Sequence, residues 1–195
     1  MQMHIHYHIM NKFLPLLLLV IVFFSGCRST TNTRIFLLTG DESLQRLNSS
    51  NAKFELRPIT LPNYLNRREF IKRIGDDEIQ ILRSWLWAET SEHSINAAFE
   101  QNLKTLMGED NVLPYGAASN STPVLLISVR HLEVKDDKFI ADFHCRLKAQ
   151  GKATLEKRLF WETAVEPEVP YIKYYKQAMA EMARLTAAWL LETQN

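Results

Sequence analysis

The stretch "FIADFHCRLKA", from Phe139 to Ala149, decides the fold of this chain because apolar and polar residues alternate along it. The polar residues between Asp142 and Lys148 fall on one face of the stretch if it is extended. A period of two residues is typical of a strand with one buried face, as in antiparallel sheets. The stretch therefore predicts a half-buried antiparallel strand. Its apolar face consists of Phe139, Ala141, Phe143, Cys145, Leu147 and Ala149.

The segments on either side predict the partners of this strand. The long apolar run "PVLLISVRHLEV" (residues 123–134) precedes it, and the turn sequence "KDDK" separates the two. After Gly151, "ATLEKRLFWETAV" (residues 153–165) runs back along the chain. Turn residues between β-favouring runs indicate hairpins, so the three segments predict an antiparallel meander.

Three earlier segments are also expected to be extended. The short apolar run "IFLL" (residues 35–38) is consistent with a first strand. The segment "FELRPITL" (residues 54–61) alternates loosely, and we expect a strand that lies at a sheet edge or ends at Pro62. Two β-favouring runs around Gly75-Asp76-Asp77 predict a hairpin.

Two segments have helical periodicity. The first runs from Ser91 to Met107 and stops at Gly108, and the second runs from about Tyr171 to Thr193. The whole pattern predicts an α/β (α+β) fold with a mixed, largely antiparallel sheet and two long helices packed on one face, in a single domain over residues 35–195. The first apolar stripe is Ile95, Ala98, Phe99, Asn102, Leu103 and Leu106, and the second is Ile172, Tyr175, Met179, Met182, Thr186 and Trp189.

The composition excludes one class of function. The 195 residues are 46% hydrophobic and 23% charged, and the formal net charge is +1. A nucleic-acid-binding protein normally shows a basic excess or a basic stripe. We therefore expect no nucleic-acid partner.

The N-terminal stretch "LPLLLLVIVFFSGCRS" (residues 14–29) predicts a lipoprotein signal. Its apolar run from Phe13 to Phe24 is too short for a membrane span of about 20 residues, but it fits the apolar region of a secretory signal. Small residues followed by Cys27 form a lipobox, the site at which bacterial lipoproteins are acylated and cut. We expect a signal peptide over residues 1–26, with translation beginning at Met10, and a lipidated tether over residues 27–34. An ordinary signal peptide with a chance cysteine, or an uncleaved anchor, are the alternatives.

The residue after the cysteine bears on the destination. Asp at that position tends to retain lipoproteins in the inner membrane of enterobacteria, and this chain has Arg28. We expect an anchor in the outer membrane, on its periplasmic face, with palmitate or similar acyl chains on Cys27. The other cysteine, Cys145, falls on an apolar strand face and is expected to be a small buried residue rather than a reactive thiol.

No set of residues with catalytic or metal-binding spacing stands out. Beyond the signal, the histidines His93, His131 and His144 do not stand at zinc-ligand spacing, and the sequence lacks a glycine-rich phosphate loop. We expect no catalytic residue, no metal site and no cofactor other than the lipid on Cys27. Trp85 and Trp87 are expected to pack between the sheet and the first helix, or else to anchor a partner.

The stretches "ITLPNYLNRREFIKRIGDDEIQI" (residues 59–81) and "SWLWAE" (residues 84–89) resemble the PqiC/YmbA-like family of ABC-type transport auxiliary lipoproteins. The chain departs from the family pattern at Asn66, where Asp is usual, and at Thr90-Ser91, where Pro-Leu is common. The matching residues are Leu61, Pro62, Tyr64, Leu65, Arg67, Trp87, Ala88 and Glu89.

The resemblance implies a function without catalysis. It implies an outer-membrane lipoprotein of an intermembrane (phospho)lipid transport system, with a docking or adaptor role. Its partners would be a periplasm-spanning MCE-domain protein, an inner-membrane permease, outer-membrane lipid and, in a ring, further copies of itself. A structural or assembly lipoprotein of another outer-membrane complex is the alternative.

The matching element itself has a physical interpretation. Pro62 lacks an N–H and ends a strand, after which Tyr64 and Leu65 can turn inward. Arg67 has a planar guanidinium that suits carboxylates or carbonyl oxygens. We expect Arg67 to clamp the turn, and a lipid-headgroup contact is the alternative.

Overall fold

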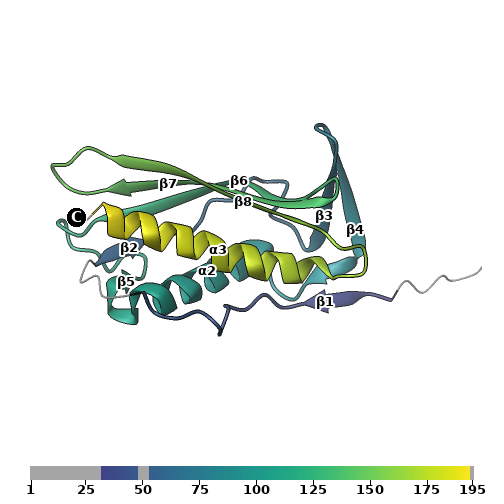
Figure 1. Ribbon diagram of the computed structural model, residues 1–195, viewed down its shortest axis with the longest axis horizontal. Helices are drawn as coiled ribbons and strands as arrows, with labels where there is room; N and C mark the ends of the chain where they lie inside the picture. Colours follow the sequence, from purple (N-terminus) through teal and green to yellow (C-terminus); the bar gives the residue numbers. More distant parts are fainter. Residues whose placement is uncertain (1–31, 48–52, 194–195) are drawn as a thin grey trace, which may run out of the picture. The chain divides into compact units, whose positions relative to one another are not determined.

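The computed structural model describes residues 32–47 and 53–193, and the residues from Thr33 onward belong to one structural unit (Figure 1). The predicted signal peptide, the start at Met10 and the lipidation site Cys27 lie outside the described residues. Among the described residues, no helix is both long and apolar enough to cross a membrane.

One mixed sheet of eight strands is built around β6. One edge of β6 pairs antiparallel with β7 along nearly its whole length, and β7 pairs antiparallel with β8. The other edge of β6 pairs in parallel with β2 near its start and with β3 near its end. The strands are β1 (Arg34–Phe36), β2 (Phe54–Leu56), β3 (Glu69–Ile74), β4 (Glu78–Trp87), β5 (Val112–Leu113), β6 (Val124–Lys135), β7 (Lys138–Lys148) and β8 (Leu155–Ala164).

The structure confirms the predicted meander and hairpin. The strands β6, β7 and β8 are joined by the two expected turns. The strands β3 and β4 form the hairpin around Gly75, whose positive φ of 64° suits a residue without a side chain. The strand β1 adds to the far side of β4 in parallel, and it ends at Phe36, before the end of the predicted run.

Residues 54–61 form neither of the two expected alternatives, an edge strand or a strand that ends at Pro62. The strand β2 lies between β6 and β5 and ends at Leu56. Pro58 has no N–H to give to the sheet, so regular pairing stops before it, and only Thr60 returns to form a bridge with Ser128. The segment therefore pairs with β6 at two separate places, first through β2 and then through the Thr60 bridge, rather than as one continuous strand.

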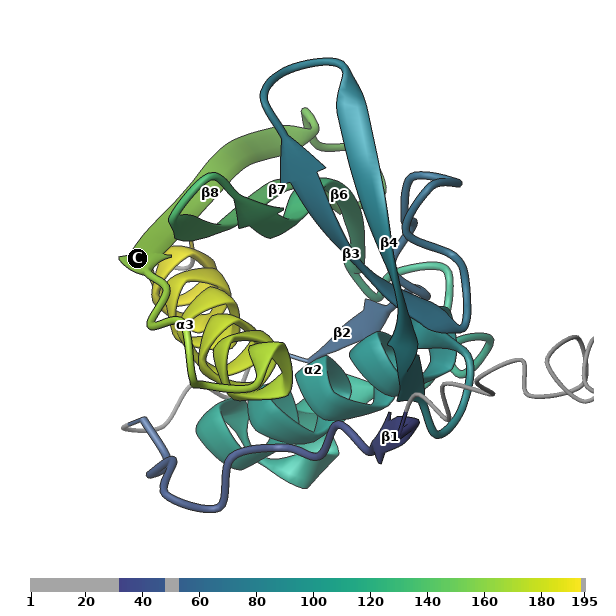
Figure 2. The ribbon, with the colours of Figure 1, turned by 90° about the vertical axis from the view of Figure 1, so that its right-hand side faces the viewer.

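Both predicted helices are present, and both lie on the same side of the sheet, which arches over them (Figure 2). The helix α2 spans Ser91–Met107, and a short 3₁₀ helix η1 (Glu109–Asn111) follows it. The Thr90 hydroxyl caps α2 by accepting the N–H of His93 at 3.3 Å, and Gly108 ends it with a φ of 97°. The helix α3 spans Tyr171–Glu192 and begins directly after Pro170.

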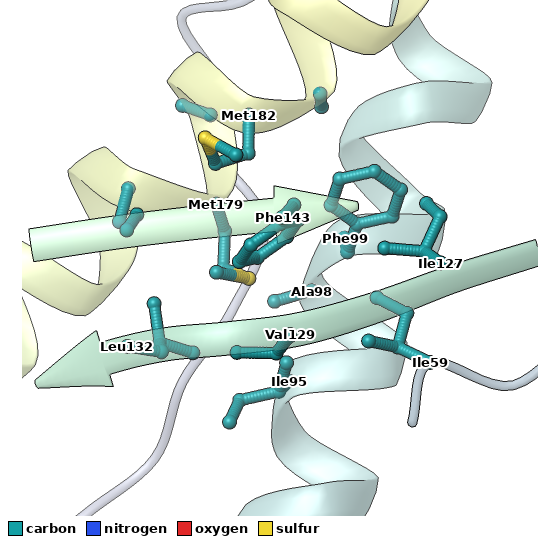
Figure 3. Close-up of a cluster of buried hydrophobic side chains, with 14 of the residues drawn as sticks. Ile59, Ile95, Ala98, Phe99, Ile127, Val129, Leu132, Phe143, Met179 and Met182 are labelled. Atoms are coloured by element: carbon teal, nitrogen blue, oxygen red, sulfur yellow. The ribbon is translucent and has the colours of Figure 1, made fainter. Parts of the chain in front are cut away.

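The core lies between the helices and the concave face of the sheet. The predicted stripe of α2 is buried throughout, and that of α3 is buried from Tyr175 to Trp189. Apolar side chains from both helices meet those of β6 and β7 there (Figure 3). The contributors shown are Ile59, Ile95, Ala98, Phe99, Ile127, Val129, Leu132, Phe143, Met179 and Met182.

One residue of the polar face of β7 departs from the pattern. Asp142 is only 3% exposed, although the alternation places it toward solvent. Arg158 on β8 covers it, with Nε and Nη2 donating to the two carboxylate oxygens at 3.0 and 2.9 Å. A bidentate ion pair of this kind supplies the hydrogen bonds that a buried carboxylate needs. The alternation along β7 does not show that Arg158 on the next strand is the partner.

Candidate functional site

The segment Leu61–Arg68, here called the motif loop, connects the Thr60 bridge to β3. Its backbone folds back on itself through three hydrogen bonds. The Leu65 N–H donates to the Pro62 carbonyl at 2.9 Å, the Asn66 N–H to the Asn63 carbonyl at 3.2 Å, and the Arg67 N–H to the Leu65 carbonyl at 2.9 Å. The side chain of Leu65 is buried, as expected.

The motif loop is tied to the end of β4 and the start of α2. The Ser91 hydroxyl donates to the Leu65 carbonyl at 2.8 Å, and the Trp87 N–H donates to the Arg68 carbonyl at 2.8 Å. The Asn66 side-chain amide donates to Oε2 of Glu92 at 3.2 Å. Elements far apart in the sequence are thereby held in one arrangement around the loop.

Tyr64 points from the motif loop to a buried carboxylate on β6. Its hydroxyl lies 3.2 and 3.0 Å from Oε1 and Oε2 of Glu133, which is 1% exposed. Arg73 on β3 donates from Nε to Oε1 at 2.9 Å, and the Leu132 N–H donates to Oε2 at 2.9 Å. His131 Nδ1 is 3.1 Å from Oε1. Both carboxylate oxygens of Glu133 therefore have hydrogen-bond partners inside the domain.

The environment of Tyr64 keeps its phenol protonated. Burial, and next the nearby Glu133 carboxylate, raise the pKa of Tyr64 to about 12. A neutral phenol remains the hydrogen-bond donor that Glu133 requires. The Arg73 guanidinium also stands 5.1 Å from the centre of the Tyr64 ring, which joins all three side chains in one cluster.

Sequence reasoning singled out Tyr64 but missed Glu133 and Arg73. The available signal was a single acidic residue inside the apolar run "HLEV", flanked by Leu132 and Val134. A carboxylate within a buried strand requires a cationic partner, and the pattern does not show which of the many arginines supplies it.

The two tryptophans pack against the last helix. Trp87, only 2% exposed, stacks on Phe70 with ring centres 4.2 Å apart and meets Tyr175 of α3 edge-on at 4.9 Å. Half-buried Trp85 meets Tyr171 of α3 at 5.2 Å. The aromatic partners of these rings thus come from the sheet and from α3.

The other family residues lie at or near the surface. Arg67 Nε is 3.8 Å from Oε2 of Glu69, and both side chains are about one-third exposed. Glu89 Oε2 is 3.4 Å from Nε2 of His93, and both side chains are well exposed. Leu61 and Pro62 are partly buried. The motif thus divides into an inner half around Tyr64, Leu65 and Trp87 and a surface half.

The described residues include no cluster of metal ligands and no exposed thiol. Within residues 32–47 and 53–193, no three His, Cys, Asp or Glu side chains come together as metal ligands would. Cys145 is buried, and burial raises the pKa of its thiol to about 12, so the thiolate does not form near neutral pH. His144 Nε2 faces Glu156 Oε2 at 3.3 Å, and both side chains reach the surface.

The family model described as the ABC-type transport auxiliary lipoprotein component matches residues 36–188. The chain belongs to this family. The match confirms the resemblance noted at the motif loop and at "SWLWAE". The family is defined by an auxiliary role in transport, not by an enzymatic class, and its members are lipoproteins.

Two solved structures have a similar fold. An uncharacterized protein of known crystal structure has 16% sequence identity and a TM-score of 0.62, covering 80% of this chain and 99% of its own. Protein XCC0632 from Xanthomonas campestris, of family DUF330, has 12% identity and a TM-score of 0.61, covering 83% and 97%. At these identities the likeness concerns the fold alone. No curated protein matches the sequence.

Proposed function

We propose that this auxiliary lipoprotein is the outer-membrane component of an intermembrane (phospho)lipid transport system. It acts as a non-catalytic adaptor between the outer membrane and a periplasm-spanning MCE-domain protein, which in turn works with an inner-membrane permease. The observation that carries the proposal is the family match over residues 36–188.

The lipobox supports the location. Acyl chains on Cys27 would anchor the chain, and more than one chain is needed for stable membrane binding. Arg28 directs the anchor to the outer membrane, where the domain faces the periplasm. The strand β1 begins at Arg34, seven residues after Cys27 in the sequence.

The site geometry supports docking. The buried Glu133 cluster and the Trp87 stack fix the motif loop from inside, while Arg67 and Glu89 remain at the surface. A preformed surface loses less conformational entropy when a partner binds. In the proposed role, lipid passes through the partners, and this domain holds the outer end of their conduit in place.

Co-purification of the full lipidated chain tests the proposal. The chain carries a C-terminal affinity tag, is expressed at native level and is extracted in mild detergent. We expect an MCE-domain protein to be recovered with it, and recovery to fall in Cys27→Ala, which lacks the anchor. Recovery of a secretin or a lipopolysaccharide exporter instead would support the assembly-lipoprotein alternative and contradict the proposal.

A density-gradient separation of inner and outer membranes tests the location. We expect the wild-type chain in the outer-membrane fraction and Arg28→Asp in the inner-membrane fraction. Wild-type chain in the inner membrane would contradict the proposed destination.

A further inference from the structure

A groove of about 350 Å³ lies between the first turns of α2 and the segment that follows β2. We call it the α2 groove. Its volume falls within the range of ordinary ligand sites, roughly 300–1,000 Å³. Its walls include Arg57, Pro58, Glu92, Asn96, Glu100 and Tyr115.

One wall displays an aromatic ring that is held in place. Tyr115 is 62% exposed, and the Arg57 guanidinium lies 4.3 Å from the centre of its ring. Tyrosine and arginine are among the residues that most often dominate the energy of protein interfaces. An exposed tyrosine fixed at the edge of a groove is therefore a candidate anchor for a partner.

A buried carboxylate fixes this pair from below. Glu55 on β2 is 1% exposed, and its Oε1 lies 2.6 Å from Nε of Arg57. Its Oε2 accepts the N–H groups of Gly116 and Ala118 at 3.0 and 2.9 Å. Burying a carboxylate is unfavourable unless it is paired, and all these partners belong to the Arg57–Tyr115 wall. The domain thus uses a buried charge to hold exposed residues still.

The opposite wall is acidic. Glu92 and Glu100 project from α2, one from its first turn and one from its third. Lys104 lies 2.7 Å from Glu100, and Glu92 accepts a hydrogen bond from the neutral amide of Asn66. Arg57 is paired with Glu55 and Glu100 with Lys104, so Glu92 supplies the excess negative charge of the groove. The Asn66–Glu92 bond also joins this wall to the motif loop.

We propose that the α2 groove binds an extended segment of a partner protein that carries a basic side chain. The ammonium or guanidinium of that side chain pairs with Glu92, and the neighbouring part of the segment packs on the Tyr115 ring. Opposite charges steer the segment into the groove, and the fixed ring supplies the contact area. The identity of the partner as a transport component rests on the proposed function, whereas the binding chemistry of the groove does not.

Phage display of random dodecapeptides on the full chain in detergent tests the proposal. The most enriched peptides are synthesised with a fluorophore, and their affinities are measured by fluorescence polarisation. We expect enriched peptides to contain Lys or Arg and to bind more weakly as salt concentration rises. Enrichment of acidic peptides, or binding that does not depend on salt, would overturn it.

Substitutions in the groove locate the binding. We expect Tyr115→Ala to weaken the peptides by roughly tenfold or more, the loss that defines an interface anchor. The charge reversal Glu92→Lys should also weaken peptide binding, and the double variant with Glu100→Lys should weaken it more than Glu92→Lys alone. Phe160→Ala, an exposed aromatic on β8, is the matched control and should leave binding unchanged. Equal binding to the wild type and the groove variants, or no enriched peptide at all, would sink the proposal.

The outcome is separable from that of the proposed function. One outcome is that basic peptides bind in a way that depends on the groove residues while no MCE-domain protein is co-purified. That result would support the proposed binding groove and contradict the transport assignment. If the MCE-domain protein is recovered equally with wild type and with the Tyr115→Ala, Glu92→Lys, Glu100→Lys variant, and no peptide depends on the groove, the transport assignment stands and the groove fails.

Discussion

At the scale of single residues, the central feature is the buried Glu133 carboxylate and the hydroxyl that Tyr64 donates to it. Replacing Tyr64 with Phe keeps the ring over Arg73 and removes only that donor. We expect Tyr64→Phe to lower the free energy of unfolding by about 1–2 kcal/mol, because a buried carboxyl group loses a hydrogen bond. Urea denaturation measures the change.

Tyr115→Phe is the control for this substitution, because it removes a hydroxyl from an exposed ring instead. It should leave the unfolding midpoint unchanged. Equal losses in the two variants would mean that the Glu133 contact contributes nothing specific.

Cys145 gives the domain a sensitivity to alkaline pH. The pKa of this thiol rises from 9.0 to about 12 in the folded state because burial disfavours the thiolate. The unfolded chain therefore loses its proton first, and stability present below pH 9 is lost as the pH rises toward 12. The slope contributed by one such group is at most about 1.4 kcal/mol per pH unit.

Chemical denaturation at pH values from about 8 to about 11 would check this behaviour. Over this range the thiol ionises in the unfolded chain but stays largely protonated in the folded domain. Cys145→Ala should be less stable at neutral pH and should show a shallower decline. A decline as steep as that of the wild type would assign the alkaline sensitivity to other groups, such as Tyr64.

Arg67 is the residue of the motif for which structure and sequence reasoning lead in different directions. Its pair with Glu69 is long and partly exposed, and such pairs contribute little. We expect Arg67→Ala to change the free energy of unfolding by less than about 1 kcal/mol. If co-purification with the proposed MCE-domain protein is nevertheless lost, Arg67 contacts a partner. A large drop in the melting temperature would instead support the expectation that Arg67 clamps the turn.

The sequence predicted the burial of individual residues well where a period was present. The apolar face of β7, including Cys145, follows directly from alternation. Asp142 and Glu133 did not, because their burial depends on Arg158 and Arg73, which lie on other strands. The Glu55–Arg57–Tyr115 wall was missed for the same reason, since Glu55 holds residues some sixty positions later in the chain.

At the scale of elements, the long segments were predictable and the short ones were not. Both helices span several turns, so their apolar stripes recur often enough to be recognised, and Gly108 and Pro170 mark one end of each. The strands β1, β2 and β5 have three residues or fewer, too few to show a period. Their parallel pairings join distant parts of the chain, which local patterns do not encode.

The packing of β4 on α3 can be tested through its two tryptophans. We expect Trp87→Ala to lower the free energy of unfolding by about 3–5 kcal/mol, because it leaves a cavity beside Phe70 and Tyr175. Trp85→Ala should lower it less, since Trp85 is only half-buried. Thermal unfolding followed by circular dichroism compares the two, and a larger effect at Trp85 would contradict the packing described.

At the scale of the whole molecule, the predicted fold class is confirmed, with a mixed and largely antiparallel sheet and two helices on one face. The membrane attachment remains a prediction. We expect Cys27→Ala to abolish labelling by radioactive palmitate and to move the chain from the membrane pellet to the periplasmic extract. Retention of label in this variant would place the acyl chain elsewhere.

The position of α3 at the end of the chain has a consequence for biogenesis. Synthesis proceeds from the N-terminus, so the segments of all eight strands are made before α3. Until then the sheet has no Tyr175, Met179 or Met182 to cover its apolar face. A chain truncated between Ala164 and Tyr171 would therefore keep every strand but lack the helix that covers this face, and exposed apolar surface of this kind favours aggregation.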